Sequence, residues 1–429
     1  MPSERPSITH ETVRDVVARE VFDGEGAVDL MGVELEWLLS RPEDRGARPD
    51  RTEVTRMVAA VGRPPAGSRV TLEPGGQVEL SSAPLRGSDA ACTAAATDLL
   101  HLDTSCRSLG FELVALGADP LREPERIVVE PRYDAMQDYF DDRNRAGRTM
   151  MCNTASIQVN VGLGSAAGRR ARWELVNLLG PVLVAAFANS PFALGAPSGW
   201  SSTRSRAWQA LDPSRSAPVP LGADPVDAFT RYVLDARVML IRVADDDYRV
   251  LSPPVSFGEW VADGHELGWP AGEDLAYHLT TLFPPVRPRG WFELRMIDAL
   301  PTPFWQIAVA VVGALVDDEA AGRAASQACR PVQDLWADAA QLGLGHPELR
   351  QAAHRTMEIA LDVISGDDLT VADAAAEFVE RYTARGRSPA DDRLDDWRRD
   401  GSLFPPPLSP LLPRDVRHDP SPPPRAGRR

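Results

Sequence analysis

The feature that most restricts how this chain can fold is an alternation of apolar and polar side chains, first seen in residues 28–39. Within "VELEW" the apolar residues are separated by Glu34 and Glu36. Neighbouring side chains of a β-strand point to opposite faces of a sheet, so the pattern predicts a strand with one apolar face. The two glutamates would lie together on the other face, where solvent would weaken their repulsion.

Three further segments repeat this alternation and predict that several strands share one polar sheet face. The polar positions are Gln77 and Glu79 in residues 69–82, Ser156, Gln158 and Asn160 in residues 155–162, and Glu293 and Arg295 in residues 291–298. Antiparallel sheets often leave one face in solvent, and that interpretation stays open. The bias toward carboxylates and carboxamides, beside loops rich in proline and tryptophan, is equally compatible with a cavity that holds a ligand.

Helical segments lie between the alternating ones. Helices are predicted at residues 10–22, 52–61, 93–109, 134–146 and 171–189, a further strand at residues 111–117, and mainly helix beyond the last alternating strand to about Arg385. No repeat or linker divides this α+β chain, so residues 1–403 are predicted to form a single domain. Residues 404–429 are rich in proline and are predicted to be a disordered tail.

Composition argues against several kinds of site and partner. The 429 residues carry a net charge of -16, which disfavours nucleic acid and anionic membranes as partners. All of the basic residues are arginine, because the sequence contains no lysine. A Walker-A phosphate loop, a pyridoxal Schiff base and a lysine nucleophile are therefore excluded.

Targeting and redox features predict a cytoplasmic protein. The N-terminal residues are charged and lack the apolar core of a signal peptide. The most apolar run, Ile307–Val316, is much shorter than the roughly 20 residues that a membrane span needs, so it predicts a buried helix. The four cysteines are far apart and form no CxxC pair, which argues against a zinc ribbon and favours reduced thiols.

Two kinds of ligand suit the predicted polar face. Crowded carboxylates attract divalent cations such as Mg²⁺, which prefers oxygen ligands, whereas no HExxH motif or histidine cluster supports zinc. Arginines hold carboxylates and phosphates, and the candidates are Arg204, Arg206, Arg287, Arg289 and Arg295. A surface ion pair remains the alternative for Arg206 and Arg289, while alternation places Arg295 beside Glu293 on the polar face.

Six segments occur in order between about residues 29 and 301: "MGVELEW", "TLEPGGQVELSS", "PRYDAMQDYF", "MCNTASIQVNVG", "FANSPFALGAPSGWSSTRSRAW" and "HLTTLFPPVRPRGWFELRMIDALP". Together they resemble the plant-type glutamate–cysteine ligase family, and within it the actinobacterial branch that serves ergothioneine biosynthesis. The resemblance implies a glutamine-synthetase-like fold, in which a curved, mainly antiparallel sheet forms a funnel backed by helices. It also implies ATP, L-glutamate and L-cysteine as substrates, with Mg²⁺, or alternatively Mn²⁺, inside the funnel.

On this resemblance the polar sheet face would carry the site of a ligase. The implied metal ligands are Glu34, Glu36, Glu79 and Glu293. The implied substrate-binding residues are Arg204, Arg295, Gln158 and Asn160, with Gln158 a further candidate for the metal. Arg287 and Gln77 are the candidates for binding ATP, and Arg295 and Glu36 are the candidates for a direct catalytic role.

The implied reaction couples two substrates through an activated acid. The γ-carboxylate of glutamate would attack the γ-phosphate of ATP, and the amine of cysteine would then displace phosphate to give γ-glutamylcysteine. A related carboxylate–amine ligase with a different acceptor amine remains the first alternative, because the acceptor pocket lies in loops. A metal-dependent phosphoester hydrolase and a catalytically inactive binder remain more distant alternatives. The segment after "RSRAW" also lacks the acidic "DTD" run associated with plant relatives.

Overall fold

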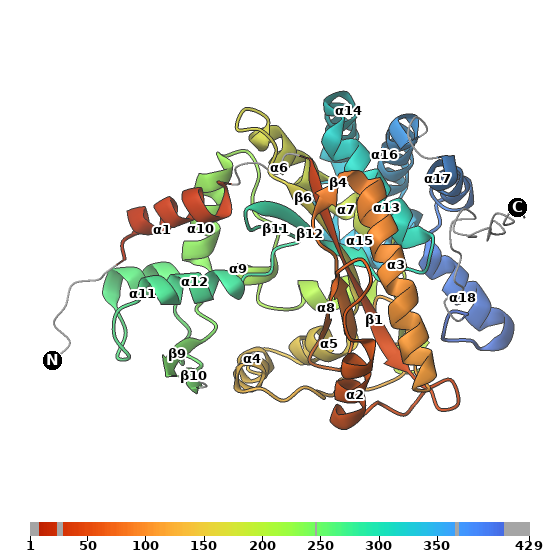
Figure 1. Ribbon diagram of the computed structural model, residues 1–429. Helices are drawn as coiled ribbons and strands as arrows, with labels where there is room; N and C mark the ends of the chain where they lie inside the picture. The colour runs from red at the N-terminus through yellow and green to blue at the C-terminus, as the bar shows by residue number, and fades with distance from the viewer. Residues whose placement is uncertain (1–7, 24–28, 245–246, 365–368, 407–429) are drawn as a thin grey trace, which may run out of the picture.

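An eight-stranded sheet forms the centre of the computed structural model, which describes residues 8–23, 29–244, 247–364 and 369–406 (Figure 1). The strand order is β11-β12-β6-β1-β3-β2, and β4 and β5 also pair with β1. Each of these pairings is antiparallel, as predicted. The strands are β1 (Leu30–Ser40), β2 (Arg69–Leu72), β3 (Val78–Ser81), β4 (Leu85–Arg86), β5 (Glu112–Val114), β6 (Ser156–Gly162), β11 (Val286–Pro288) and β12 (Trp291–Asp298).

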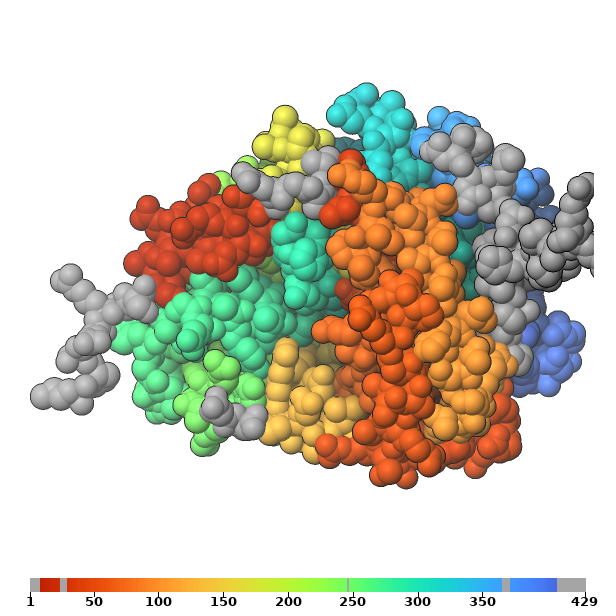
Figure 2. All heavy atoms as spheres, viewed as in Figure 1, coloured from red at the N-terminus to blue at the C-terminus, as the bar shows by residue number. Residues whose placement is uncertain are grey.

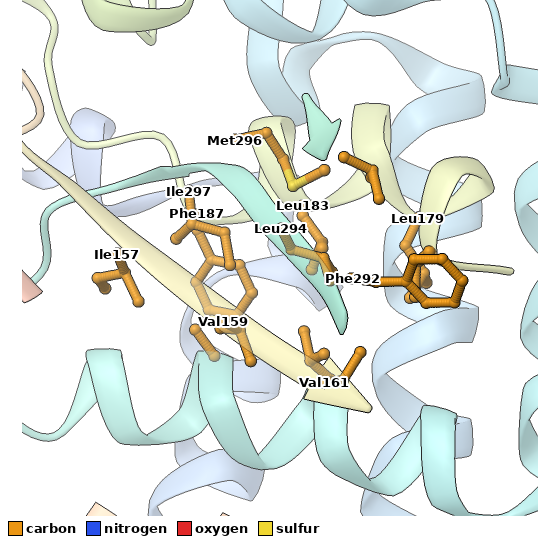
Figure 3. Packing of buried hydrophobic residues seen from close by; sticks show 14 of the residues in the cluster. Ile157, Val159, Val161, Leu179, Leu183, Phe187, Phe292, Leu294, Met296 and Ile297 are labelled. Carbon is orange, nitrogen blue, oxygen red and sulfur yellow. The ribbon is translucent and has the colours of Figure 1, made fainter. Parts of the chain in front are cut away.

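One face of the sheet is apolar and packs into the core, which confirms the alternation read from the sequence. In β6, Ile157, Val159 and Val161 are at most 2% exposed. Figure 3 shows them beside the apolar side chains of β12 and near Leu183 and Phe187. Alternate residues of the same strands therefore project their polar groups to the opposite face.

Two layers of helices back the apolar face (Figure 1). Contacts with the sheet are made by α3 (Gly87–Ser108), α6 (Arg169–Leu178), α7 (Gly180–Ala186) and α13 (Phe304–Asp317). Beyond them lie α14 (Glu319–Cys329), α15 (Trp336–Leu342), α16 (Pro347–Ile364), α17 (Leu369–Arg381) and α18 (Pro389–Asp400), with short 3₁₀ turns after α14, α15 and α17. The predicted buried helix is α13. Among the described residues, no helix has both the length and the apolar character to cross a membrane.

The remaining elements lie mainly around the polar side and the lower edge of the sheet (Figure 1). The helices are α1 (His10–Val16), continued by a π-helix (Val17–Val21), α2 (Arg51–Val61), α4 (Pro131–Asp141), α5 (Ala146–Asn153), α8 (Thr203–Gln209), α9 (Pro213–Ser216), α10 (Pro225–Asp235), α11 (Phe257–Asp263) and α12 (Gly272–Thr280). Two small hairpins are formed by β7 (Phe192–Ala193) with β8 (Ala196–Pro197), and by β9 (Ile241–Ala244) with β10 (Asp247–Arg249).

Two predicted helices are wrong in extent. The helix predicted over residues 171–189 is divided into α6 and α7 at Gly180, where an added Cβ would lie 2.0 Å from the Trp336 ring. The helix predicted over residues 134–146 is α4, which ends at Asp141, and α5 follows it as a separate helix. The side chain of Asn144 accepts a hydrogen bond from the Ala146 amide at 2.7 Å and so helps to start α5.

The predicted tail begins at a residue that packs on the folded part of the chain. Phe404 lies against a small buried cluster that includes Leu38 and Val114. The Arg45 guanidinium lies 4.9 Å from the centre of the Phe404 ring. Residues 407–429, which make up most of the predicted tail, lie outside the described residues.

Candidate functional site

Strand register brings the predicted acidic residues together on the polar face. Glu36 of β1 lies directly opposite Glu79 of β3, and Glu34 lies opposite Gln158 of β6. At the other side of the sheet, Arg287 of β11 lies opposite Glu293 of β12. Side chains at such paired positions are close neighbours, so the pairing itself builds a charged surface.

This surface forms the floor of a cavity of about 870 Å³. The predicted site residues that line it are Glu34, Glu36, Gln77, Glu79, Gln158, Arg204, Arg287, Glu293 and Arg295. Further walls come from α4, α5 and the segment after α12, with Arg132, Tyr133, Met136, Met150, Met151 and Phe283. Figure 2 shows the surface hollowed between the green lobe of α10–α12 and the orange region of α2 and α3. The polar face is therefore enclosed, which decides against a simply solvated sheet face.

Three carboxylates converge in one half of the cavity. Glu36, Glu73 and Glu79 each offer an oxygen, and these oxygens lie within 4.8 Å of one another. Glu36 accepts hydrogen bonds from the Ser156 amide at 2.8 Å and from Gln158 Nε2 at 3.0 Å. These partners are neutral, and the arrangement leaves carboxylate charge that a hard divalent cation would balance.

Burial and mutual repulsion raise the pKa values of three glutamates in and beside this cluster. Burial, followed by the nearby Glu79, raises the pKa of Glu36 to about 7. Burial and the charges of Glu36 and Glu79 raise the pKa of Glu73 to about 8. The pKa of Glu34 is also raised, by burial and by the charges of Glu293 and Glu79. A cation bound among these oxygens would reverse these shifts, because it favours the ionised carboxylate.

The arginine-rich half of the cavity has the opposite character. Arg287 Nε donates to Glu293 Oε2 at 2.6 Å, its Nη2 donates to Oε1 at 3.0 Å, and Arg295 Nη1 donates to Oε2 at 2.9 Å. Although burial opposes ionisation of Glu293, Arg295 and Arg287 lower its pKa to about 2. Glu293, one of the predicted metal ligands, thus lies in an arginine network apart from the Glu36–Glu73–Glu79 cluster.

Arg204 approaches the site from α8 rather than from the sheet. Its Nη2 donates to the carbonyl oxygen of Arg295 at 2.6 Å. The helix is held by its first residues, since Ser202 Oγ donates to Asp298 Oδ1 at 2.9 Å and accepts from the Ser205 amide at 3.0 Å. Burial lowers the pKa of Arg204, partly offset by Asp298 and Glu36. Besides Arg287, the cavity therefore has the guanidinium groups of Arg204 and Arg295 for an anionic ligand.

Two predicted residues have structural contacts besides their place in the site. Gln77 Nε2 donates to the carbonyl oxygens of Thr154 at 2.9 Å and Met151 at 3.3 Å, and so ties the β2–β3 hairpin to α5 and β6. Its buried Oε1 has no hydrogen-bond partner among the described residues. Asn160 is not part of the cavity wall; its Nδ2 donates to Glu34 Oε1 at 3.0 Å, and its Oδ1 accepts from Trp291 Nε1 at 3.1 Å.

Glu73 is the acidic residue that the sequence analysis missed. It directly follows β2, and its amide continues the ladder by donating to the carbonyl oxygen of Gln77 at 2.9 Å. Continued alternation from Thr71, which lies opposite Glu79, would have placed Glu73 on the polar face. The following turn must be glycine-rich, because a Cβ at Gly75 would lie 2.1 Å from the carbonyl oxygen of Cys152.

Comparisons with known proteins find several glutamate–cysteine ligases. The profile of glutamate–cysteine ligase family 2 (GCS2) matches residues 30–403. The chain is 39% identical over 402 residues to glutamate–cysteine ligase EgtA of Mycobacterium tuberculosis, which spans 91% of this chain and 92% of that protein. It is 40% identical over 383 residues to EgtA of Mycolicibacterium smegmatis, with 86% and 88% covered. The chloroplastic glutamate–cysteine ligase of Arabidopsis thaliana is 32% identical over 266 residues, which span 58% of this chain and 49% of that protein.

A solved structure supports the fold. The crystal structure of glutamate–cysteine ligase from Francisella tularensis in complex with AMP superposes with a TM-score of 0.52 and 13% sequence identity. The superposition covers 89% of this chain and 87% of that chain. At this identity the likeness concerns the fold alone, and it confirms the predicted fold class.

Proposed function

Because the chain belongs to glutamate–cysteine ligase family 2, we infer that it is an ATP-dependent glutamate–cysteine ligase whose product is γ-glutamylcysteine. The likeness to EgtA over nine-tenths of the chain supports a role in ergothioneine biosynthesis. The observation that carries the inference is one cavity that joins a carboxylate cluster to buried arginines. That combination suits a reaction between a cation-bound nucleotide and an anionic amino acid.

The reaction has two steps in this cavity. The γ-carboxylate of glutamate attacks the γ-phosphate of ATP, which gives γ-glutamyl phosphate and ADP. The amine of cysteine then forms the amide bond as the bond between the acyl carbon and the phosphate oxygen breaks, so phosphate leaves and the amine proton passes to solvent. Enclosure of the intermediate limits its loss to water.

We assign the cation site of this proposal to Glu36, Glu73 and Glu79, with Glu34 beside them. The convergence of three carboxylate oxygens, and the raised pKa values of Glu36 and Glu73, support Mg²⁺, or alternatively Mn²⁺, at this position. When bound, the ion would neutralise phosphate charge during transfer. Glu293 was predicted as the fourth metal ligand. In the proposal it also orients Arg287 and Arg295, to which it is hydrogen-bonded.

The arginines supply fixed positive charge on the other side of the cavity. Arg204 and Arg295 bind the glutamate or the phosphoryl group being transferred, and Gln158 fixes Arg295 through a hydrogen bond of 2.6 Å. Arg287 and the unpaired Oε1 of Gln77 remain the candidates for contacts with ATP. Such preorganised donors stabilise the charge that develops on oxygen in both steps.

The proposal extends to the organisation and location of the enzyme. The family match ends at residue 403, which supports one catalytic domain up to that residue, followed by a proline-rich segment whose first residue, Phe404, packs on the domain. The four cysteines are buried as thiols rather than joined in disulfides, which supports a reducing compartment such as the cytoplasm, where ATP is also available.

ADP release tests the function directly. The purified protein is incubated with Mg²⁺, ATP and L-glutamate, with and without L-cysteine, and the product is identified by mass. We expect ADP release that depends on cysteine and a product with the mass of γ-glutamylcysteine. Turnover only with another amine would keep the ligase chemistry and change the acceptor. ATP-independent cleavage of phosphate esters would instead support a hydrolase.

A further inference from the structure

Asp298, at the end of β12, is a buried carboxylate that has no role in the function proposed so far; it is 2% exposed. Its Oδ2 accepts hydrogen bonds from the Asn189 amide at 2.8 Å and Ser190 Oγ at 2.7 Å, and its Oδ1 accepts one from Ser202 Oγ at 2.9 Å. A Cβ at Gly117 would lie 2.3 Å from its Cγ, so residue 117 must be glycine to leave room for the carboxylate. All three donors are neutral. A buried carboxylate is costly unless its charge is compensated, so a positive group is expected nearby.

Arg204 supplies this positive charge. Burial lowers the pKa of Arg204, and the charge of Asp298 opposes this effect. Burial likewise raises the pKa of Asp298, and the charge of Arg204 opposes that effect. Among the described residues the two side chains form no direct ion pair, so each favours the charged form of the other at a distance.

Two serine hydroxyls connect Asp298 to the first turn of α8. Ser190 Oγ donates to Asp298 and accepts from the Arg204 amide at 3.2 Å. Ser202 Oγ donates to Asp298 and accepts from the Ser205 amide at 3.0 Å. Amides at the start of a helix have no partner within the helix, and here each of these two is joined to the carboxylate through one hydroxyl. The position of the Arg204 backbone therefore depends on Asp298.

The indirect connection leaves the guanidinium of Arg204 available to a ligand. Arg287 and Arg295 bind Glu293 directly, whereas Arg204 forms no ion pair within the described part of the chain. Arg204 lines the main cavity, where its Nη2 donates to the carbonyl oxygen of Arg295 and its buried Nε has no hydrogen-bond partner among the described residues. A direct ion pair with Asp298 would occupy these donors. Charge compensation across the serine hydroxyls leaves them for an anionic substrate.

We propose that Asp298 is a positioning residue for the ligase reaction, which holds the start of α8 and compensates the charge of Arg204 without occupying its donors. It does not touch the substrate and acts through Arg204. The proposal rests on the proposed function and deepens it, because it adds a residue to the recognition of the anionic substrate. A purely structural role of Asp298 would affect all substrates equally, so kinetics distinguish the two roles.

Steady-state kinetics of Asp298→Asn test the role of the charge, because asparagine keeps the shape of the side chain. We expect kcat/KM for L-glutamate to fall by about 10–100-fold, the cost of disturbing hydrogen bonds to a charged group, while the KM for ATP changes by less than about twofold. The matched control Asp373→Asn, at an exposed position of α17, should leave both unchanged. An unchanged kcat/KM for glutamate in folded Asp298→Asn, or an equal rise in the KM of every substrate, would overturn the proposal.

A double-mutant cycle with Arg204→Gln separates a positioning role from a structural one. If Asp298 acts through Arg204, Asp298→Asn should lower kcat/KM for glutamate by less than about twofold once Arg204 is replaced. Losses that multiply in the double variant would mean that Asp298 acts independently of Arg204, which contradicts the proposal.

A second variant covers the case in which Asp298→Asn does not fold. Ser202→Ala removes one of the two hydroxyl connections and is measured in the same cycle, with the same expected and contrary results. Absence of turnover in the wild-type protein would refute the proposed function itself. Wild-type turnover with multiplying losses would refute only the role of Asp298, so the two failures are distinguishable.

Discussion

The two halves of the main cavity use the same residue type in opposite ways. Glu36 and Glu293 are both glutamates of the central sheet with side chains on its polar face. Glu36 lies among other carboxylates and has a pKa of about 7, whereas Glu293 lies among arginines and has a pKa of about 2. Among the described residues Glu36 forms no direct ion pair, whereas Glu293 pairs with Arg287 and Arg295. The difference shows that strand alternation determines on which face of the sheet a side chain lies. The residues on the neighbouring strands determine how readily that side chain ionises.

The largest expected effect comes from removing one charge of the carboxylate half. Glu36→Gln keeps the size of the side chain but weakens the cation site, and we expect turnover to fall by about 1000-fold. ADP release at saturating substrates measures the effect. Glu377→Gln, an exposed position on α17, is the matched control and should retain full activity. If Glu36→Gln kept more than about a tenth of the activity, its role in the cation site would be wrong.

The same substitution should have opposite effects on the stability of the two halves. Glu293→Gln leaves Arg287 and Arg295 without their buried counter-charge, and we expect it to lower the free energy of unfolding by about 3–5 kcal/mol. Glu36→Gln removes a repelled carboxylate and should leave stability unchanged or raised in the absence of divalent cations. Denaturant unfolding in EDTA compares the two variants. If the two variants were destabilised equally, the proposed difference between the two halves of the cavity would be wrong.

Glu73 tests whether the cluster extends beyond the residues predicted from the sequence. Its carboxylate lies within 4.8 Å of oxygens of Glu36 and Glu79, so Glu73→Gln should raise the Mg²⁺ concentration for half-maximal activity by about 10–100-fold. Thr71→Val, which removes only a hydroxyl donor to Glu79, should have a smaller effect. A normal Mg²⁺ requirement in Glu73→Gln would remove this residue from the cation site.

The last prediction concerns pH. Glu36 and Glu73 have folded pKa values of about 7 and 8, above the roughly 4.3 of an unfolded glutamate, so the folded state binds more protons than the unfolded state in this range. Stability without divalent cations should therefore fall as pH rises from about 5 to 8, by at most about 1.4 kcal/mol per pH unit for each proton. Thermal unfolding in EDTA measures this slope, and saturating Mg²⁺ should flatten it. If saturating Mg²⁺ left this pH dependence of stability unchanged, titrating groups outside the carboxylate cluster would be responsible for it.

Much of the sheet could be predicted from the sequence because alternation is a local signal. The polar positions of β1, β3, β6 and β12 follow from a period of two, and most of them line the cavity. Glu73 was missed because it stands next to Pro74, Gly75 and Gly76, which are typical of a turn and hide the continued alternation of β2. The break at Gly180 was missed although the sequence carries a signal for it, because the following Pro181 has no amide hydrogen to continue the hydrogen bonds of α6.

The site's electrostatic contrast was not predictable from alternation. Alternation placed Glu293 on the same face as Glu34 and Glu36, and all three were assigned to the metal. Which of them meets arginines depends on the order of strands in the sheet, and on Arg287 of the neighbouring β11. Cavity residues contributed by helices, such as Tyr133 and Trp208, carry no such period in the sequence.

The exclusive use of arginine for positive charge around the cavity has a consequence for the survival of the enzyme during turnover. An acyl phosphate transfers its acyl group to any free amine within reach, and a lysine beside it would become γ-glutamylated. A guanidinium stays protonated at neutral pH and is a poor nucleophile, even for Arg287, whose pKa burial lowers to about 10. With no lysine anywhere in the chain, the intermediate has no side-chain amine to modify, and self-inactivation by this route is closed.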